Sequence, residues 1–197
     1  MLIRAILLLA ALTAQPSYIQ TASPSYIDEA LRLGRSPDAA LHASFTKGYE
    51  LPVTAPIASA EIITEFRRAV LIVREHMQRG EVGYTDHELG GAIKPHLGLV
   101  TFIVSVNLHP LNTYTKMPAY DLYVSSGAIS APVASETPIR RDPIYALGPP
   151  GSPLVGLRLE VTLSREKLAA ARAPELIVTN ETADVLWRGR IDLSRYR

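Results

Sequence analysis

The sequence predicts an α+β fold rich in β-structure: an antiparallel sheet or β-sandwich of about five or six strands, mostly within residues 99–193, with an N-terminal helical region packed on it. Two observations support this class. Capped helical patterns fill the first part of the chain, and apolar and polar residues then alternate along several segments. A chain of 197 residues is long enough for one domain with a substantial core.

The first fourteen residues, MLIRAILLLAALTA, have the layout of a secretory signal peptide. Arg4 precedes an apolar run over residues 5–12, and small residues follow. Because this run is shorter than the roughly 20 residues that span a bilayer, we expect no stable transmembrane anchor. The predicted location is the periplasm or the extracellular space. The chain has no cysteine, so disulfides and thiolate metal sites are excluded.

Residues 15–58 form a predicted N-terminal extension with two short helices, and residues 59–197 form a single globular β-rich domain. The segments SPSYIDEALRLG and SPDAALHASFTKGY both begin with Ser-Pro and end at a glycine, Gly34 and Gly48. His42, in the second helix, is expected at the surface.

PVTAPIAS is predicted to be a linker that leads into a longer helix over residues 61–79. Apolar residues recur there at helical spacing, while Arg67 and Arg68 belong to a basic group expected on the solvated surface. The β-branched run AVLIV leaves a buried strand over residues 69–73 as an open alternative. The predicted apolar stripe consists of Ile62, Phe66, Val70, Val73 and Met77.

Three segments alternate as half-buried strands do: residues 101–109, 119–126 and 157–163. The first turns Phe102, Val104, Val106 and Leu108 to one face. A short helix that Ser164 caps is expected next, followed by a closing hairpin of residues 175–179 and 184–193 around a turn at Asn180. LGPPGSP, residues 147–153, is predicted to be a rigid loop.

The segment GYTDHELGGAIKPHLG contains the residues most suggestive of a metal site, namely Asp86, His87 and His96. The spacing is unfavourable, because the residue four positions after His87 is Gly91 and nine helical residues would place His96 on the opposite side. A capping box between Thr85 and Glu88 is the favoured interpretation, and it predicts a short helix from residue 86 to about residue 93.

A second candidate site follows from pairing two of the strands. If residues 101–109 and 119–126 form a hairpin, four polar side chains gather on its exposed face. Tyrosine with amide, carboxylate and imidazole groups suits a polar ligand such as a glycan. The four residues are Asn107, His109, Asp121 and Tyr123.

Lys and Arg total 20 against 19 acidic residues, so no overall field attracts nucleic acid. The sequence contains no G-x-S-x-G elbow and no phosphate-binding loop. We therefore expect an exported, non-enzymatic binding protein or a component of a surface or periplasmic assembly, without a cofactor. A glycan, a peptide or another copy of the chain is the expected partner. The alternative is a secreted metal-dependent hydrolase that uses His87 and His96.

Overall fold

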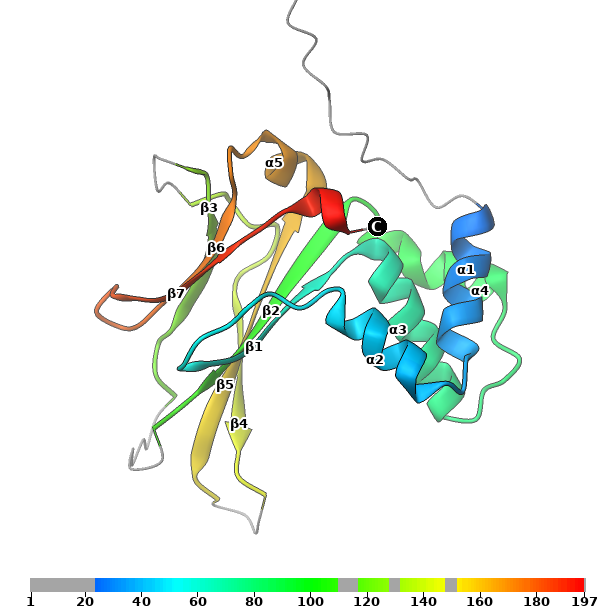
Figure 1. The fold of residues 1–197 in the computed structure, drawn as a ribbon, viewed down its shortest axis with the longest axis horizontal. Helices are drawn as coiled ribbons and strands as arrows, with labels where there is room; N and C mark the ends of the chain where they lie inside the picture. The colour runs from blue at the N-terminus through cyan, green and yellow to red at the C-terminus, as the bar shows by residue number, and fades with distance from the viewer. Residues whose placement is uncertain (1–23, 110–116, 128–131, 148–151, 197) are drawn as a thin grey trace, which may run out of the picture.

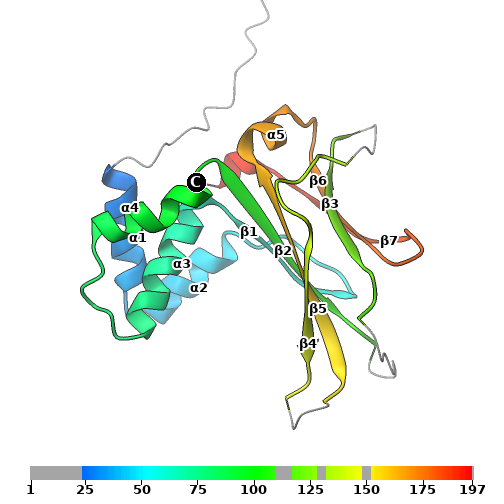
Figure 2. The ribbon, with the colours of Figure 1, turned by 180° about the vertical axis from the view of Figure 1, so that it is seen from behind.

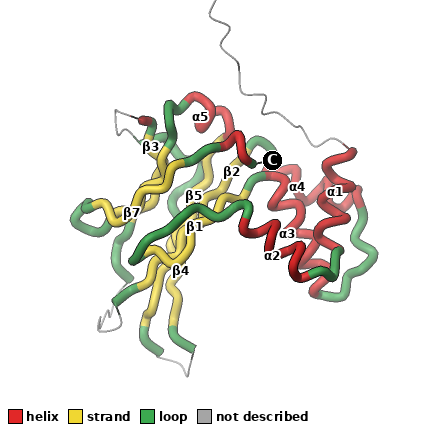
Figure 3. Tube along the Cα trace, in the orientation of Figure 1, coloured by secondary structure: helices red, strands yellow, loops and turns green. Residues whose placement is uncertain are grey.

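The computed structural model describes residues 24–109, 117–127, 132–147 and 152–196. Three predicted segments fall at least partly outside the described residues. They are the signal peptide, residues 148–151 of the predicted 147–153 loop, and residues 110–116 between the two strands of the predicted hairpin. Two antiparallel sheets form one part of the molecule, and four helices gather beside them (Figures 1 and 3). The predicted α+β class, with N-terminal helices packed on a sheet, is confirmed.

The helices and strands have the following bounds. The helices are α1 (Pro24–Arg35), α2 (Ala39–Lys47), α3 (Glu65–Gln78), α4 (Asp86–Ile93) and α5 (Arg165–Ala170), with short 3-10 turns η1 (Lys94–His96) and η3 (Leu193–Arg195). The strands are β1 (Ile57–Ile63), β2 (Leu99–Asn107), β3 (Asp121–Ser125), β4 (Arg140–Tyr145), β5 (Leu154–Ser164), β6 (Glu175–Thr179) and β7 (Val185–Arg190).

The strands form a four-stranded sheet in the order β1-β2-β5-β4 and a three-stranded sheet in the order β3-β6-β7. The apolar alternation predicted for β2 and β5 is confirmed, because Phe102 pairs with Ile62 and Val161 and all three side chains are buried. The apolar face of the four-stranded sheet meets the apolar face of the three-stranded sheet, and the side chains between them form the sandwich core. This core includes Val104, Val106, Leu122, Val124, Leu159, Leu163, Leu176, Val178 and Trp187.

The other face of the four-stranded sheet is polar. Residues paired directly across an antiparallel sheet share a face. One such row consists of Ile63, Thr101 and Thr162, and the next consists of Glu61, Ile103, Glu160 and Arg140. We call this surface the outer face of the four-stranded sheet.

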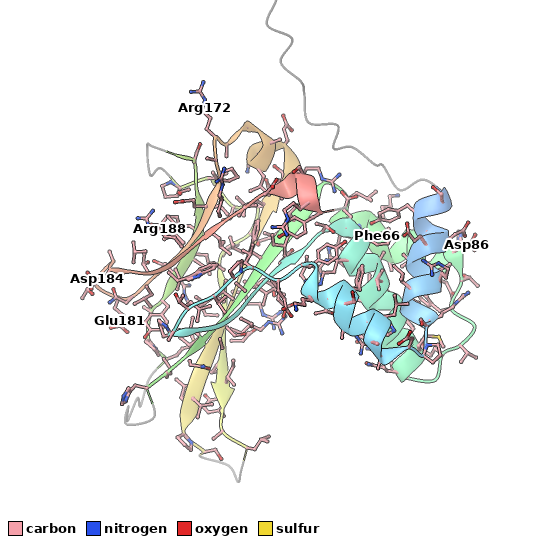
Figure 4. All side chains as sticks on the ribbon, viewed as in Figure 1. Phe66, Asp86, Arg172, Glu181, Asp184 and Arg188 are labelled. Carbon is pink, nitrogen blue, oxygen red and sulfur yellow. The ribbon has the colours of Figure 1, made fainter. Side chains whose placement is uncertain are left out.

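The helices have an apolar core of their own, centred on α3. Tyr26 of α1 packs edge-on against Phe66 of α3, with ring centroids 5.2 Å apart, and Figure 4 shows Phe66 within the helical part. Gly34 permits this packing, because a Cβ there would lie 2.5 Å from the Cβ of Val73. Phe45 packs against both the helical core and the sandwich core.

The predicted linker and the start of the predicted 61–79 helix are wrong. Residues 57–63 form β1, and α3 begins only after Thr64, whose hydroxyl accepts from the Arg67 amide. The strand alternative at residues 69–73 is also wrong, since those residues lie within α3. His42 is buried rather than exposed. Its Nε2 hydrogen-bonds the Ser36 carbonyl at 2.8 Å.

Several local predictions are confirmed. The capping box of Thr85 and Glu88 starts α4, Ser164 caps α5, and β6 and β7 form the closing hairpin. The division of the chain at residues 58 and 59 stays a prediction, and β1 runs across that point. None of the described helices is long and apolar enough to cross a membrane.

Candidate functional site

The first turn of α3 places charged side chains against the sheet. Thr64 follows the last residue of β1 and caps α3, so the helix begins directly after the strand. The first residues of α3 therefore remain beside β1 and β2. Glu65 is 4% exposed and Arg67 is 2% exposed, although charged residues are rarely buried without partners. This turn is therefore the part of the described chain in which burial and charge coincide most closely.

Arg67 is held within the protein through both of its terminal nitrogens, whereas its Nε has no hydrogen-bond partner among the described residues. Its guanidinium donates to Glu61 at 2.5 Å and to the Ile62 carbonyl at 3.2 Å, and it lies 5.2 Å from the centroid of the Tyr49 ring. Burial lowers the pKa of Arg67, and the charge of Glu61 opposes this change. Because these contacts come from β1 and from the segment before it, Arg67 fastens α3 to the sheet and is not accessible to a ligand.

Glu65 makes a second buried connection. Its carboxylate accepts from the Gly98 amide at the entrance to β2 and lies 3.4 Å from Arg165 at the start of α5. Arg165 in turn donates its amide to the Gly98 carbonyl at 2.7 Å. We call Thr64, Glu65, Arg67 and their partners the polar junction between the helices and the sheet.

Arg68 differs from its neighbours because it retains donors for an external group. It is half-buried on the outer face of the four-stranded sheet, where Nη2 donates to the Thr101 hydroxyl at 3.1 Å. No carboxylate of the described residues lies within ion-pair distance of Arg68; Glu160 acts on it only at longer range. Burial lowers the pKa of Arg68, and Glu160 partly offsets that effect.

His96 and two hydroxyl groups complete this location. Burial lowers the pKa of His96, and the positive charge of Arg68 lowers it further, so the two groups are within electrostatic range of each other. The hydroxyls of Thr101 and Thr162 are 2.9 Å apart. We call Arg68, His96, Thr101 and Thr162 the Arg68 corner. Its guanidinium, imidazole and hydroxyls are all groups that bind a carboxylate or a phosphate oxygen.

The predicted polar ligand face is not assembled as expected. β2 pairs with β1 and β5, whereas β3 pairs with β6, so the predicted hairpin is wrong. Asn107 and His109 lie at the end of β2, while Asp121 and Tyr123 lie in the other sheet. Asp121 is ion-paired with Arg141 of β4, which also donates to the Tyr120 carbonyl at 2.7 Å. A ligand-binding role for these four residues stays a prediction, without the shared surface that motivated it.

The predicted metal ligands are also separated. Asp86 and His87 are exposed at the start of α4, and Figure 4 shows Asp86 at the far side of the helical part. His96 lies outside α4, in the 3-10 turn η1, nine residues after His87. Within the described ranges, no group of three or more His, Asp or Glu side chains could hold a metal ion. The Asp86 carboxylate instead accepts from the amide of His87 at 2.8 Å.

The sequence interpretation placed Arg67 and Arg68 together on the solvated surface, which is wrong for Arg67. The available signal was Thr64, which can cap a helix and would place both arginines in its first turn. The partners of Arg68 could not have been found in this way, since Thr101 lies 33 residues further along the chain.

Comparison with protein-family models, with curated protein sequences and with solved structures found no match to this chain.

Proposed function

We propose that the protein is an exported, non-enzymatic binding protein, and that its ligand presents an anionic group to the Arg68 corner. The signal-like N-terminal sequence supports export. A carboxylate on a peptide or on an acidic glycan fits the partners expected from the sequence, and it supplies the charge that the corner lacks.

The half-buried guanidinium of Arg68 carries the proposal. A guanidinium has five N–H donors, and a partly desolvated one gains most from an anion that accepts two of them together. The described residues give Arg68 one hydroxyl acceptor and no carboxylate at ion-pair distance. An anion placed there would also accept from the threonine hydroxyls and favour the protonated form of His96.

Glu160 restricts the kind of anion. Its side chain shares the outer face with Thr162, two residues further along β5, and its charge reaches Arg68. A group with one negative charge is repelled less by this carboxylate than a group with two. We therefore expect a carboxylate to bind better than the doubly charged form of phosphate.

The proposal can be tested by titrating the full mature chain with acetate and with inorganic phosphate at equal ionic strength, and following amide NMR shifts. Saturable shifts centred on Thr101 and Thr162, with acetate binding the tighter, are the expected result. Arg68→Gln should weaken acetate binding at least tenfold. Arg74→Gln, which removes the same charge from the same helix, is the matched control and should bind as the wild type does.

Two results would count against this function. One is the absence of saturable shifts at the corner with either anion. The other is equal binding by Arg68→Gln and Arg74→Gln, which would mean that the anions respond to overall charge and not to the corner.

A further inference from the structure

The hairpin of β4 and β5 has an exposed apolar end. Four of the large apolar side chains exposed in the described structure belong to it: Ile144, Tyr145, Leu147 and Val155. Leu147 is fully exposed and Tyr145 is 60% exposed. Soluble proteins seldom gather such residues at one place without an interaction to explain them. We call these residues, with Pro143, Pro153 and Leu154, the hairpin end.

The hairpin end has no charge, and the charged residues begin at the same level on both strands. No Asp, Glu, Lys, Arg or His occurs over residues 143–157, in a chain with 20% charged residues. Asp142 on β4 is the direct partner of Arg158 on β5, and Arg140 is the partner of Glu160. The change from apolar to charged therefore lies on one line across the hairpin, as a planar boundary between lipid and water requires.

The position and length of the hairpin end suit a membrane surface. Figures 1 and 2 show the hairpin extending from the sandwich at the end away from the helices. From Asp142 to Leu147 the chain rises by about 16 Å at the strand spacing, roughly half of a 30 Å hydrocarbon core. The hairpin end can enter one leaflet and cannot span the bilayer. Tyr145 has the amphipathic ring that is enriched at such interfaces.

The neighbouring strand places polar groups beside the base of the hairpin end. Asn107 of β2 is paired with Gly156, and the Leu108 amide donates to the Val155 carbonyl at 2.9 Å. Asn107 and His109 are exposed beside this part of the hairpin. They are two of the residues that the sequence suggested for ligand binding, and here they adjoin an apolar surface.

We propose that the protein attaches to a membrane surface by inserting the β4–β5 hairpin end into one leaflet. A projecting apolar end suits a fluid layer that deforms around it, whereas a protein partner would need a matching cavity. The charged boundary pairs opposite charges, Arg140 with Asp142 and Arg158 opposite Asp142. Attachment therefore does not depend on anionic lipid. It is also separate from the Arg68 corner, since Thr162 lies eight residues from Leu154 along β5, about 26 Å.

The test is flotation of the full mature chain with vesicles of phosphatidylcholine alone and of phosphatidylcholine with one-third phosphatidylglycerol. The expected result is flotation with both, reduced at least fivefold by the double variant Tyr145→Ser, Leu147→Ser. Val82→Ser, at an apolar residue that is 71% exposed in the loop between α3 and α4, is the matched control and should float as the wild type does. Equal melting temperatures establish that the variants fold.

Three outcomes would overturn the proposal: no flotation of the wild type, flotation that survives the double variant, or flotation only with the anionic vesicles. Light scattering distinguishes the cause if the wild type does not float. If the wild type forms dimers that the double variant abolishes, and does not float, the hairpin end joins copies of the chain. A negative flotation result does not bear on the proposed anion binding at the Arg68 corner, because the acetate titration contains no lipid.

Discussion

The sandwich and the polar junction hold the molecule together in different ways. The sandwich core consists of apolar side chains that alternate along paired strands, and those of Phe102, Val104 and Leu159 are completely buried. At the junction with the helices, the buried groups include Thr64, Glu65 and Arg67. Apolar contacts stabilise without fixing direction, whereas hydrogen bonds to charged groups do fix it.

The apolar cores and the polar junction therefore have different roles in the structure. Each part contributes its own apolar core, and Phe45 is an apolar side chain that packs against both. The polar junction adds less stability than its number of bonds suggests, because burying charge has a desolvation cost. Its contribution is to fix the angle between α3 and the sheet, which in turn holds Arg68 over Thr101.

The largest expected effect lies in the sandwich. Phe102→Ala removes a completely buried ring from the centre of β2, and we expect a loss of about 3–5 kcal/mol in the free energy of unfolding, measured by chemical denaturation. Ile103→Ala is the matched control on the opposite face of the same strand, where the side chain is half-buried. It should lose about 1 kcal/mol. Equal losses would mean that the outer face is as well packed as the core.

A smaller loss is expected at the polar junction. Glu65→Gln keeps an acceptor for the Gly98 amide but removes the charge beside Arg165, and we expect a loss of about 2 kcal/mol. Glu75→Gln on the same helix breaks an exposed pair with Arg79 and should lose under about 0.5 kcal/mol. Denaturation of both variants measures the difference. If Glu65→Gln costs no more than its control, the junction does not depend on buried charge.

The same contrast explains what the sequence predicted. Strands β2 and β5 have one apolar face each, so alternation alone identified them and their buried residues. The start of α4 could also be predicted from the sequence, because the capping bonds between Thr85 and Glu88 join residues only three positions apart. Where local chemistry decides the structure, the sequence contains the necessary information.

Contacts between distant segments were not predicted. The edge strand β4 has no alternation, since Pro143, Ile144 and Tyr145 are all exposed in succession. Strand β1 was not predicted, because its apolar residues lead directly into the helical pattern of α3 and part of the strand was assigned to that helix. The error in pairing β2 with β3 then misplaced the polar ligand face. The Arg68 corner joins α3, η1, β2 and β5, and no local pattern indicates that these four meet.

The smallest expected effect is a pH dependence that arises at the Arg68 corner. The folded protein lowers the pKa of His96 from its ordinary value of 6.5, so the unfolded chain takes up the proton at a higher pH than the folded chain does. Stability is therefore retained above pH 6.5 and lost as the pH falls through the pKa of the folded state. His96→Gln should flatten this decline in denaturation experiments between pH 8 and pH 5.

Two comparisons isolate the contribution of His96. His87→Gln removes an exposed histidine of α4 and should retain the decline. Saturating acetate should reduce the decline in the wild type, because a bound anion favours protonated His96 in the folded state and raises its pKa. Arg68→Gln should abolish that response to acetate. If acetate acts equally on Arg68→Gln and on the wild type, the anion does not bind beside His96, and the corner is then part of the polar junction alone.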